Sequence, residues 1–187
     1  MREHGVLRRI LLIYEESIRR LGSGQDLPPD ALTQSADIVH RFIEDYHEKL
    51  EEDFVFPRFQ KAGKLAELTQ VLTQQHLAGR RITQQVQGVT PTSLRDAGAR
   101  KAIENQLRAF VHMYQPHAAR EDTVLFPALH NIVSWHDYDE LGETFEAKEK
   151  QLFGVDGFEK IVAQVDAIER ALGIEALSRF TPTTPSP

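Results

Sequence analysis

The sequence predicts an all-α protein, an antiparallel up-down four-helix bundle with an internal pseudo-twofold repeat and two extra C-terminal helices. Long stretches carry apolar residues at helical spacing, and no stretch alternates as a strand would. Gly and Pro are sparse enough to leave long helices between them, and long helices with short links pack as antiparallel neighbours. The fragment "HEKLEEDFVFP" at 47–57 also returns as "HAAREDTVLFP" at 117–127, so half the chain copies the other half.

The predicted helices follow one another along the chain with short links. The bundle helices span 2–22, 29–61, 64–87 and 93–133, and the two further helices span 137–152 and 156–172. Pro57, Pro116 and Pro127 fall inside the second and fourth helices. We expect both helices to kink or break at these prolines, because proline removes a backbone hydrogen bond and clashes with the preceding turn.

The length of 187 residues favours a single hydrophobic core. We expect the bundle to occupy residues 1–133 and a helical extension, residues 134–175, to pack on it. Residues 176–187, rich in Thr and Pro, should form an extended tail.

Composition excludes several classes of function. A net charge of −6 argues against nucleic-acid binding, and no apolar run is long enough to span a membrane, so we expect neither partner. Without cysteine the chain has no disulfide or thiolate ligand, so His and carboxylate must hold any metal. No secretory leader is recognisable, which predicts a cytoplasmic protein, or a periplasmic one if a leader was removed. No pattern indicates an oligomeric state.

Titratable residues interrupt the inward, apolar stripe of every bundle helix. They are His4, then His47 with Glu51, then His76, then His117 with Glu121. Residues four apart on a helix are offset by only about 40°, so each His and its following Glu point into the bundle together. A buried carboxylate without a partner costs several kcal/mol, so these groups need a shared compensating charge. A dinuclear metal centre supplies it.

The repeat divides these ligands evenly. Each half contributes one lone His and one His-x-x-x-Glu pair, which provides two imidazoles and one oxygen from each of two bridging glutamates for each metal. Coordination positions then remain for a small ligand. Iron, manganese and zinc all suit such nitrogen and oxygen donors. The order also differs from the Glu-x-x-His pairs of ferritin-like di-iron bundles.

A lone His and a His-x-x-x-Glu pair, each occurring twice on four successive helices, resemble the hemerythrin-like family of HHE cation-binding domains in its four-His, two-Glu variety. The resemblance covers residues 1–133 and is carried by "REHGVLRRI", "YHEKLEEDFVFP", "QQHLAGRRI" and "PHAAREDTVLFP". It implies a four-helix bundle around two non-haem iron ions bridged by oxide or hydroxide. The expected ligand is oxygen, hydrogen peroxide or nitric oxide.

Departures from the oxygen-carrying hemerythrins change the expectation. Those proteins have a second His four residues after the lone His of the third helix, where this chain has Arg80, which argues against reversible oxygen carriage. They also use an Asp five residues after the fourth-helix His, so Asp122 is the alternative to Glu121. Similar domains use a Glu directly after the second-helix His, which makes Glu48 a further candidate ligand.

Several neighbouring residues have two interpretations. Tyr114, one turn before His117, either packs in the core or donates to a bound ligand or coordinates, and packing is favoured. His40 shares the inward stripe but lies about 10.5 Å along the helix from His47, so we expect it in the core or behind the ligands. Arg8 and Arg80 should form ion pairs with acidic residues of neighbouring helices. The remaining histidines are expected to be non-ligands: His112, His130 and His136.

The leading functional interpretation is a di-iron protein that binds, senses or removes small oxidants. The enzymatic version of this hypothesis is a peroxide-decomposing, catalase-like activity or a nitric-oxide-handling one. The alternatives are iron storage or donation, repair of damaged iron proteins, and a structural bundle stabilised by metal.

Overall fold

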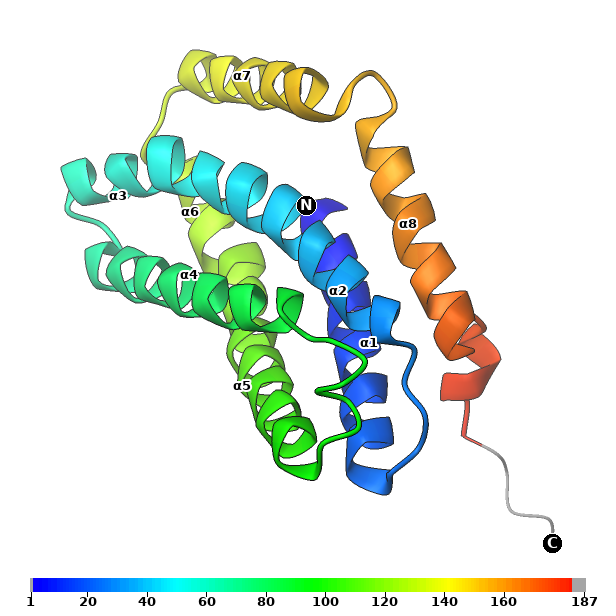
Figure 1. Cartoon of the computed structure of the whole chain (residues 1–187). Coiled ribbons are helices and arrows are strands. Elements are labelled where there is room, and N and C mark those ends of the chain that lie inside the picture. Colours follow the sequence, from blue (N-terminus) through cyan, green and yellow to red (C-terminus); the bar gives the residue numbers. More distant parts are fainter. Residues whose placement is uncertain (1, 183–187) are drawn as a thin grey trace, which may run out of the picture.

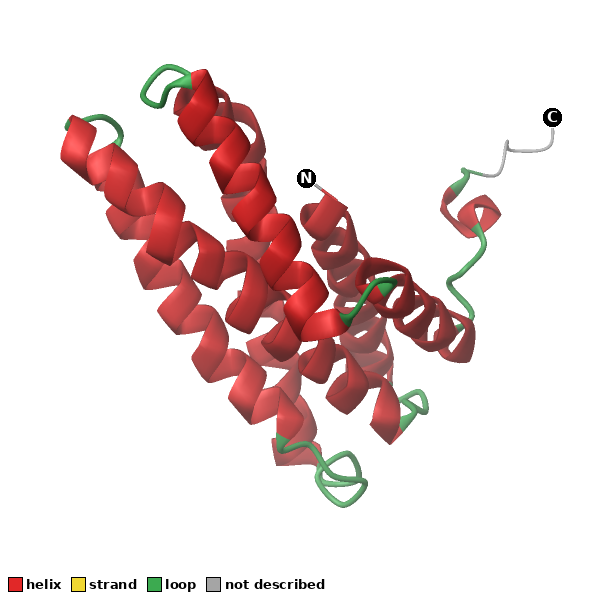
Figure 2. Ribbon diagram, turned by 90° about the horizontal axis from the view of Figure 1, so that it is seen from above, coloured by secondary structure: helices red, strands yellow, loops and turns green. Residues whose placement is uncertain are grey.

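The computed structural model describes residues 2–182, and every regular element among them is a helix (Figure 2). The bundle elements are α1 (Arg2–Ser23), α2 (Pro29–Ile38), η1 (Val39–Glu48), η2 (Glu51–Val55), α3 (Phe56–Ala62), α4 (Ala66–Gln87), α5 (Ala97–Arg120), η3 (Glu121–Leu125) and α6 (Phe126–Leu129). The extension comprises α7 (Trp135–Phe153), α8 (Gly157–Leu172) and η4 (Leu177–Phe180). The segments η1, η2 and η3 are π-helical, and η4 is a 3₁₀ helix.

The bundle elements join into four continuous rods: α1, then α2 through α3, then α4, then α5 through α6. Consecutive rods run in opposite directions (Figure 1). The first rod packs along the fourth, and the second packs along the third. The observed ranges agree with the predicted ones except that the fourth rod begins at Ala97, where Asp96 caps the helix by accepting the Ala99 N–H, and ends at Leu129.

The expected proline breaks are absent from the described rods. Helix α5 continues through Pro116, and the second and fourth rods continue through Pro57 and Pro127. Immediately before each of the latter two prolines the helix widens into a π turn, in which Phe56 N–H donates to the Glu51 carbonyl and Phe126 N–H to the Glu121 carbonyl. Each proline lies in the first turn of the α-helix that follows, where a missing N–H costs little.

Two apolar clusters form the core of the bundle. The larger one includes Leu7, Ile10, Phe42, Leu107 and Phe110, and the buried residues of α8 pack into it. The smaller one contains Val55, Phe56, Phe59, Leu72, Leu125, Leu129 and Leu141. Along the second and fourth rods the predicted ligands lie between residues of these two clusters, so apolar side chains flank them on both sides.

The two extension helices contact the bundle differently. Helix α8 packs against α1 and α2 and buries Ile161, Val165 and Ile168, while Arg9 of α1 pairs with two of its acidic residues. Helix α7 buries only Leu141 and lies alongside the second rod (Figure 1).

The predicted extended tail is only partly described. Residues 177–180 form the 3₁₀ helix η4 instead of an extended strand, and residues 183–187 lie outside the described part of the chain. No helix among residues 2–182 combines the length and apolar character needed to cross a bilayer.

The packing of α8 can be measured by truncating one of its buried side chains. Ile168 is 2% exposed, so Ile168→Ala should lower the free energy of unfolding by about 2–5 kcal/mol through lost burial and a residual cavity. Leu177→Ala removes a side chain that is 84% exposed and should change the free energy of unfolding by less than about 0.5 kcal/mol. Urea unfolding of both variants tests this, and equal effects would contradict the packing of α8.

Candidate metal centre

The six side chains singled out by the repeat lie together in the interior of the bundle. Each is at most 8% exposed. The Nε2 atoms of His4 and His47 are 2.9 Å apart, and those of His76 and His117 are 3.3 Å apart. The four imidazoles therefore form two pairs, and each pair combines one lone His with one His of a His-x-x-x-Glu pair.

The two glutamates connect the two imidazole pairs. Glu51 Oε1 lies 3.5 Å from His47 Nε2, and its Oε2 lies 3.5 Å from His76 Nε2. Glu121 Oε2 lies 3.3 Å from His4 Nε2, and its Oε1 lies 3.1 Å from His117 Nε2. Each carboxylate thus directs one oxygen to each pair, which is the placement that a carboxylate bridging two cations requires.

The donor set fits two cations. All four oxygens of Glu51 and Glu121 are buried, and none of them accepts a hydrogen bond among the described residues. Buried acceptors are nearly always satisfied, so four of them facing four ring nitrogens call for a missing positive charge. No ligand here is a thiolate, and a set of imidazole and carboxylate donors suits iron, manganese or zinc.

The pKa values of the cluster residues also indicate that the buried carboxylates lack a compensating positive charge. Burial and the nearby Glu121 carboxylate raise the pKa of Glu51 well above its usual value. Burial also acts to raise the pKa of Glu121, but the close approach of the His117 and His4 rings to its oxygens outweighs burial and lowers that pKa. Burial and the neighbouring His4 lower the pKa of His47 to about 3, which keeps the ring in the neutral form that a metal requires.

An outer carboxylate orients the lone His of the first half. His4 Nδ1 lies 2.8 Å from Asp122 Oδ1, and Arg8 donates to the other oxygen of Asp122. A hydrogen bond at Nδ1 leaves Nε2 free to face the centre. Asp122, the alternative ligand, therefore lies at the outer edge of His4, while Glu121 faces the cluster.

The second half repeats this arrangement. His76 Nδ1 lies 3.0 Å from Glu52 Oε1, and Arg80 Nη2 lies 2.8 Å from the same oxygen. The predicted ion pairs of Arg8 and Arg80 are thus confirmed. Sequence reasoning missed Glu52, although its position one residue after the first-half glutamate matches that of Asp122 in the repeat.

Two other outer contacts differ between the halves. His117 Nδ1 lies 2.8 Å from Gln75 Oε1, a contact that sequence reasoning also missed. His47 occupies the equivalent position in the first half, and within residues 2–182 no side chain pairs with its Nδ1 atom. At 8% exposure, His47 is also the most exposed of the six residues. The two sides of the centre are therefore not equivalent.

The repeated Phe-Pro motif packs against the lone histidines. The ring of Phe56 stacks on His76 with a centroid distance of 5.5 Å and an interplanar angle of 23°. Phe126 lies against His4 with a centroid distance of 5.9 Å. Each phenylalanine thus holds the lone His of the opposite half, which explains why the motif follows each His-x-x-x-Glu pair.

Glu48 lies behind His76 and faces away from the six-residue cluster. Its Oε1 accepts a hydrogen bond of 2.6 Å from the Tyr114 hydroxyl, and its Oε2 lies 3.1 Å from Arg80 and 4.0 Å from His76 Nδ1. Burial raises the pKa of Glu48 to about 7. Tyr114 is almost fully buried and its hydroxyl points to Glu48, so packing with a satisfied hydroxyl is its observed state.

Gly79 makes room for this contact. A Cβ atom at Gly79 would stand 2.0 Å from the Tyr114 hydroxyl oxygen and 2.8 Å from Cζ of the ring. Since real Cβ contacts are never that close, only glycine lets Tyr114 reach Glu48 across α4.

The other histidines lie away from the centre. The expectation that His40 lies in the core or behind the ligands is wrong, because its side chain is 48% exposed and contacts Glu44 at 3.2 Å. The helix is wide and π-helical over 39–48, which alters which positions face inward. His112, His130 and His136 are exposed, and His136 pairs with Glu140 at 3.4 Å on the surface.

Comparisons with known proteins agree with this geometry. Residues 1–129 match the hemerythrin HHE cation-binding domain. The chain is 49% identical over 184 residues to uncharacterized proteins of Mycobacterium bovis and of two strains of Mycobacterium tuberculosis, covering 98% of this chain and 72% of each relative. No solved structure matches the chain.

The close approach of Tyr114 to Gly79 predicts the effect of adding a methyl group at position 79. Gly79→Ala should displace Tyr114 from Glu48 and lower the free energy of unfolding by about 1–3 kcal/mol, because the added Cβ overpacks α4. Gly5→Ala is the control, since its Cβ would meet nothing within 4 Å and alanine favours the helix by up to about 1 kcal/mol. Thermal unfolding of both variants decides. A Gly79→Ala protein as stable as Gly5→Ala would contradict the contact.

The raised pKa of Glu48 predicts how the stability of the metal-free protein depends on pH. The pKa is about 7 in the folded state and 4.5 as the usual value, so the folded state binds more protons between these values. Stability should therefore fall as pH rises from about 4 to about 8, with a contribution of about 3 kcal/mol from this group.

Urea unfolding in chelator at pH 5 and pH 8 measures this contribution. The variant Glu48→Gln should lose less stability than the wild type between the two values. Identical losses in both proteins would show that Glu48 does not titrate in this range.

Proposed function

The chain belongs to the hemerythrin HHE cation-binding family, and on that premise we propose that it is a non-haem di-iron protein that binds, senses or removes small oxidants such as oxygen, hydrogen peroxide or nitric oxide. One observation carries the proposal. Glu51 and Glu121 each direct one oxygen to each of two imidazole pairs, and within residues 2–182 none of these four buried oxygens has a hydrogen-bond donor.

Six residues would hold the two ions. His4 and His47 would bind one ion, His76 and His117 the other, and Glu51 and Glu121 would bridge them. A pseudo-twofold axis between the halves is part of the proposal, and the matched contacts of His4 with Asp122 and of His76 with Glu52 support it. When bound, the metal pair would supply redox chemistry and Lewis acidity at vacant coordination positions.

The carboxylates and arginines around the cluster would hold the histidines in position. Asp122 and Glu52 accept from the Nδ1 atoms of the lone histidines and keep Nε2 directed at the centre, and Arg8 and Arg80 hold these carboxylates in place. The apolar clusters on either side exclude water and lower the local dielectric, which strengthens every charge interaction inside.

A cavity that reaches two of the six residues favours a reactive centre over a purely structural one. His47 and Glu51 both line it, so a small molecule can approach the first imidazole pair. A closed structural site has no need of such access.

Metal content of single variants tests the ligand assignment. Protein grown with ample iron should contain about two iron ions per chain, and Glu51→Ala or Glu121→Ala should remove at least one, because each carboxylate would serve both ions. His136→Ala is the matched control, since it disrupts a His-x-x-x-Glu pair that lies on the surface. One iron or none in the wild type, or no loss in the two glutamate variants, would refute the dinuclear assignment.

Optical spectroscopy of the same protein, purified with and without air, tests the proposed reactivity. Absorption that changes reversibly with oxygen or nitric oxide would favour binding or sensing. Oxygen release from added hydrogen peroxide at many turnovers per chain would favour removal. Iron-loaded protein inert to all three would exclude this function.

A further inference from the structure

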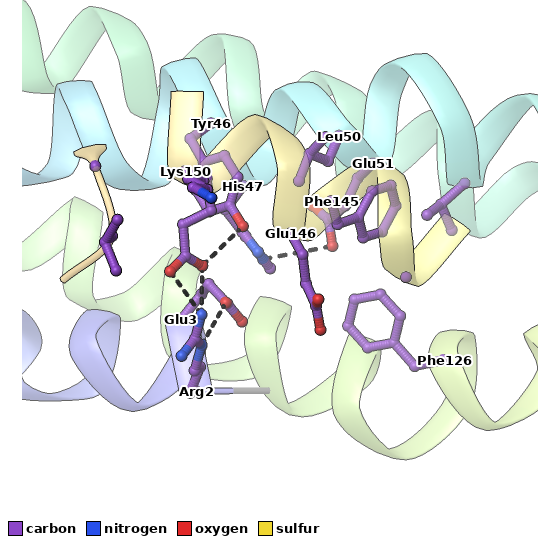
Figure 3. Close-up of a pocket in the computed structure, with 15 residues that line it drawn as sticks. Arg2, Glu3, Tyr46, His47, Leu50, Glu51, Phe126, Phe145, Glu146 and Lys150 are labelled. Carbon is purple, nitrogen blue, oxygen red and sulfur yellow. Dashed lines mark hydrogen bonds and ion pairs between the residues drawn. The ribbon is translucent and has the colours of Figure 1, made fainter. Parts of the chain in front are cut away.

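A cavity of about 600 Å³ lies between α7 and the bundle (Figure 3). One wall comes from the second rod and includes His47 and Glu51, which belong to the six-residue cluster. The opposite wall comes from α7 and includes Phe145, Glu146 and Glu149. The family match ends at residue 129, so the C-terminal extension supplies the outer half of this cavity.

The lining combines apolar side chains with charged ones. Leu50, Val55, Phe126 and Phe145 provide the apolar surface. The charged residues are of both signs: Arg2, Glu3, Glu146, Glu149 and Lys150. Such a lining suits an uncharged molecule with an apolar body, because the apolar side chains would contact that body and the charges of both signs do not form a site for one particular ion.

The size of the cavity exceeds what the smallest oxidants need. A water molecule takes up about 30 Å³ of liquid volume, and oxygen, nitric oxide and hydrogen peroxide each have only two heavy atoms. Pockets that hold organic ligands range from about 300 to 1,000 Å³. The cavity at α7 falls within that range.

Polar contacts fix the outer wall in position. Arg2 donates to both oxygens of Glu149, and the Tyr46 hydroxyl donates to the same carboxylate at 3.1 Å. Phe145 and Lys148 of α7 contact the ring of Phe54. The cavity is therefore bounded by a few definite contacts between α7 and the bundle.

We infer that this cavity binds a small organic molecule with an apolar body and an uncharged, oxygen-bearing end, of which alkyl hydroperoxides are the class that fits an oxidant-handling centre. The body would lie against Leu50, Val55 and Phe145, and the oxygen-bearing end would face His47 and Glu51. The choice of hydroperoxides rests on the proposed function, whereas the binding of the apolar body does not.

A larger side chain at Gly142, which lines the cavity, offers a way to block it. Gly142 precedes Phe145 by three residues and Glu146 by four, which places it on the same face of α7. A Cβ atom there would meet nothing within 4 Å, so the position accepts a side chain, and phenylalanine favours the helix over glycine. Because Gly142 lines the cavity, the ring of Gly142→Phe should occupy part of it. Gly142→Ala is the matched control that leaves most of the volume open.

Binding is tested first with tert-butyl alcohol, a redox-inert analogue of tert-butyl hydroperoxide, by methyl NMR of the protein as purified. In the wild type and Gly142→Ala the alcohol should shift the methyl resonances of Leu50 and Val55, and in Gly142→Phe its affinity should fall by about tenfold or more. Equal affinity in all three proteins, or shifts confined to other methyl groups, would overturn the inference.

Reactivity is tested next on iron-loaded protein by following the optical spectrum after adding peroxide. Gly142→Phe should slow the response to tert-butyl hydroperoxide by about tenfold or more and leave that to hydrogen peroxide within about threefold. Equal slowing of both responses would contradict an organic ligand. If the wild type responds to neither peroxide and also not to oxygen or nitric oxide, while tert-butyl alcohol still binds at Leu50 and Val55, the proposed function fails and the binding site remains. A wild type that responds to oxygen or nitric oxide but not to tert-butyl hydroperoxide would overturn the choice of hydroperoxides alone.

Discussion

The burial of two facing carboxylates, Glu51 and Glu121, is the constraint on which the rest of this structure depends. Neither side chain is more than 2% exposed, and none of their oxygens accepts a hydrogen bond from the part of the chain that the structure describes. An ionised carboxylate costs several kcal/mol to bury unless a positive charge compensates it. Four imidazoles face these oxygens with Nε2, the atom through which an imidazole can bind a metal ion. Cations between the rings and the carboxylates, as proposed above, would supply the compensating charge.

The contacts around the cluster explain the longer repeated motif. A π turn contains more residues than an α turn, so Phe56 lies closer to the face of Glu51 than a spacing of about 100° per residue would place it. That rotation lets Phe56 stack on His76, and the equivalent π turn brings Phe126 to His4. The π turns and the prolines that follow them thus belong to the site as much as the ligating residues do.

The two halves share the six central side chains and the π turns, but the residues that surround them differ. Where the second half has Gly79, the first half has Leu7, and where the first half has Glu48, the second has Ala118. One side of the centre is closed by the buried contact between Tyr114 and Glu48. The other side, at His47, borders the cavity under α7. The repeated halves thus place six matched side chains in unequal surroundings.

Local pattern alone was sufficient for the helical class, most helix boundaries and the six converging residues, because helical periodicity and an internal repeat are both visible in one dimension. The tertiary structure decided the rest. The chain has four His-x-x-x-Glu pairs, beginning at His40, His47, His117 and His136, and spacing cannot tell which are buried. Burial depends on which rod lies opposite and on the π turns that rotate one part of a helix against another, so His40 is exposed and His47 is not. The room that Gly79 leaves for Tyr114, and the cavity that α7 encloses, likewise exist only between segments far apart in the chain.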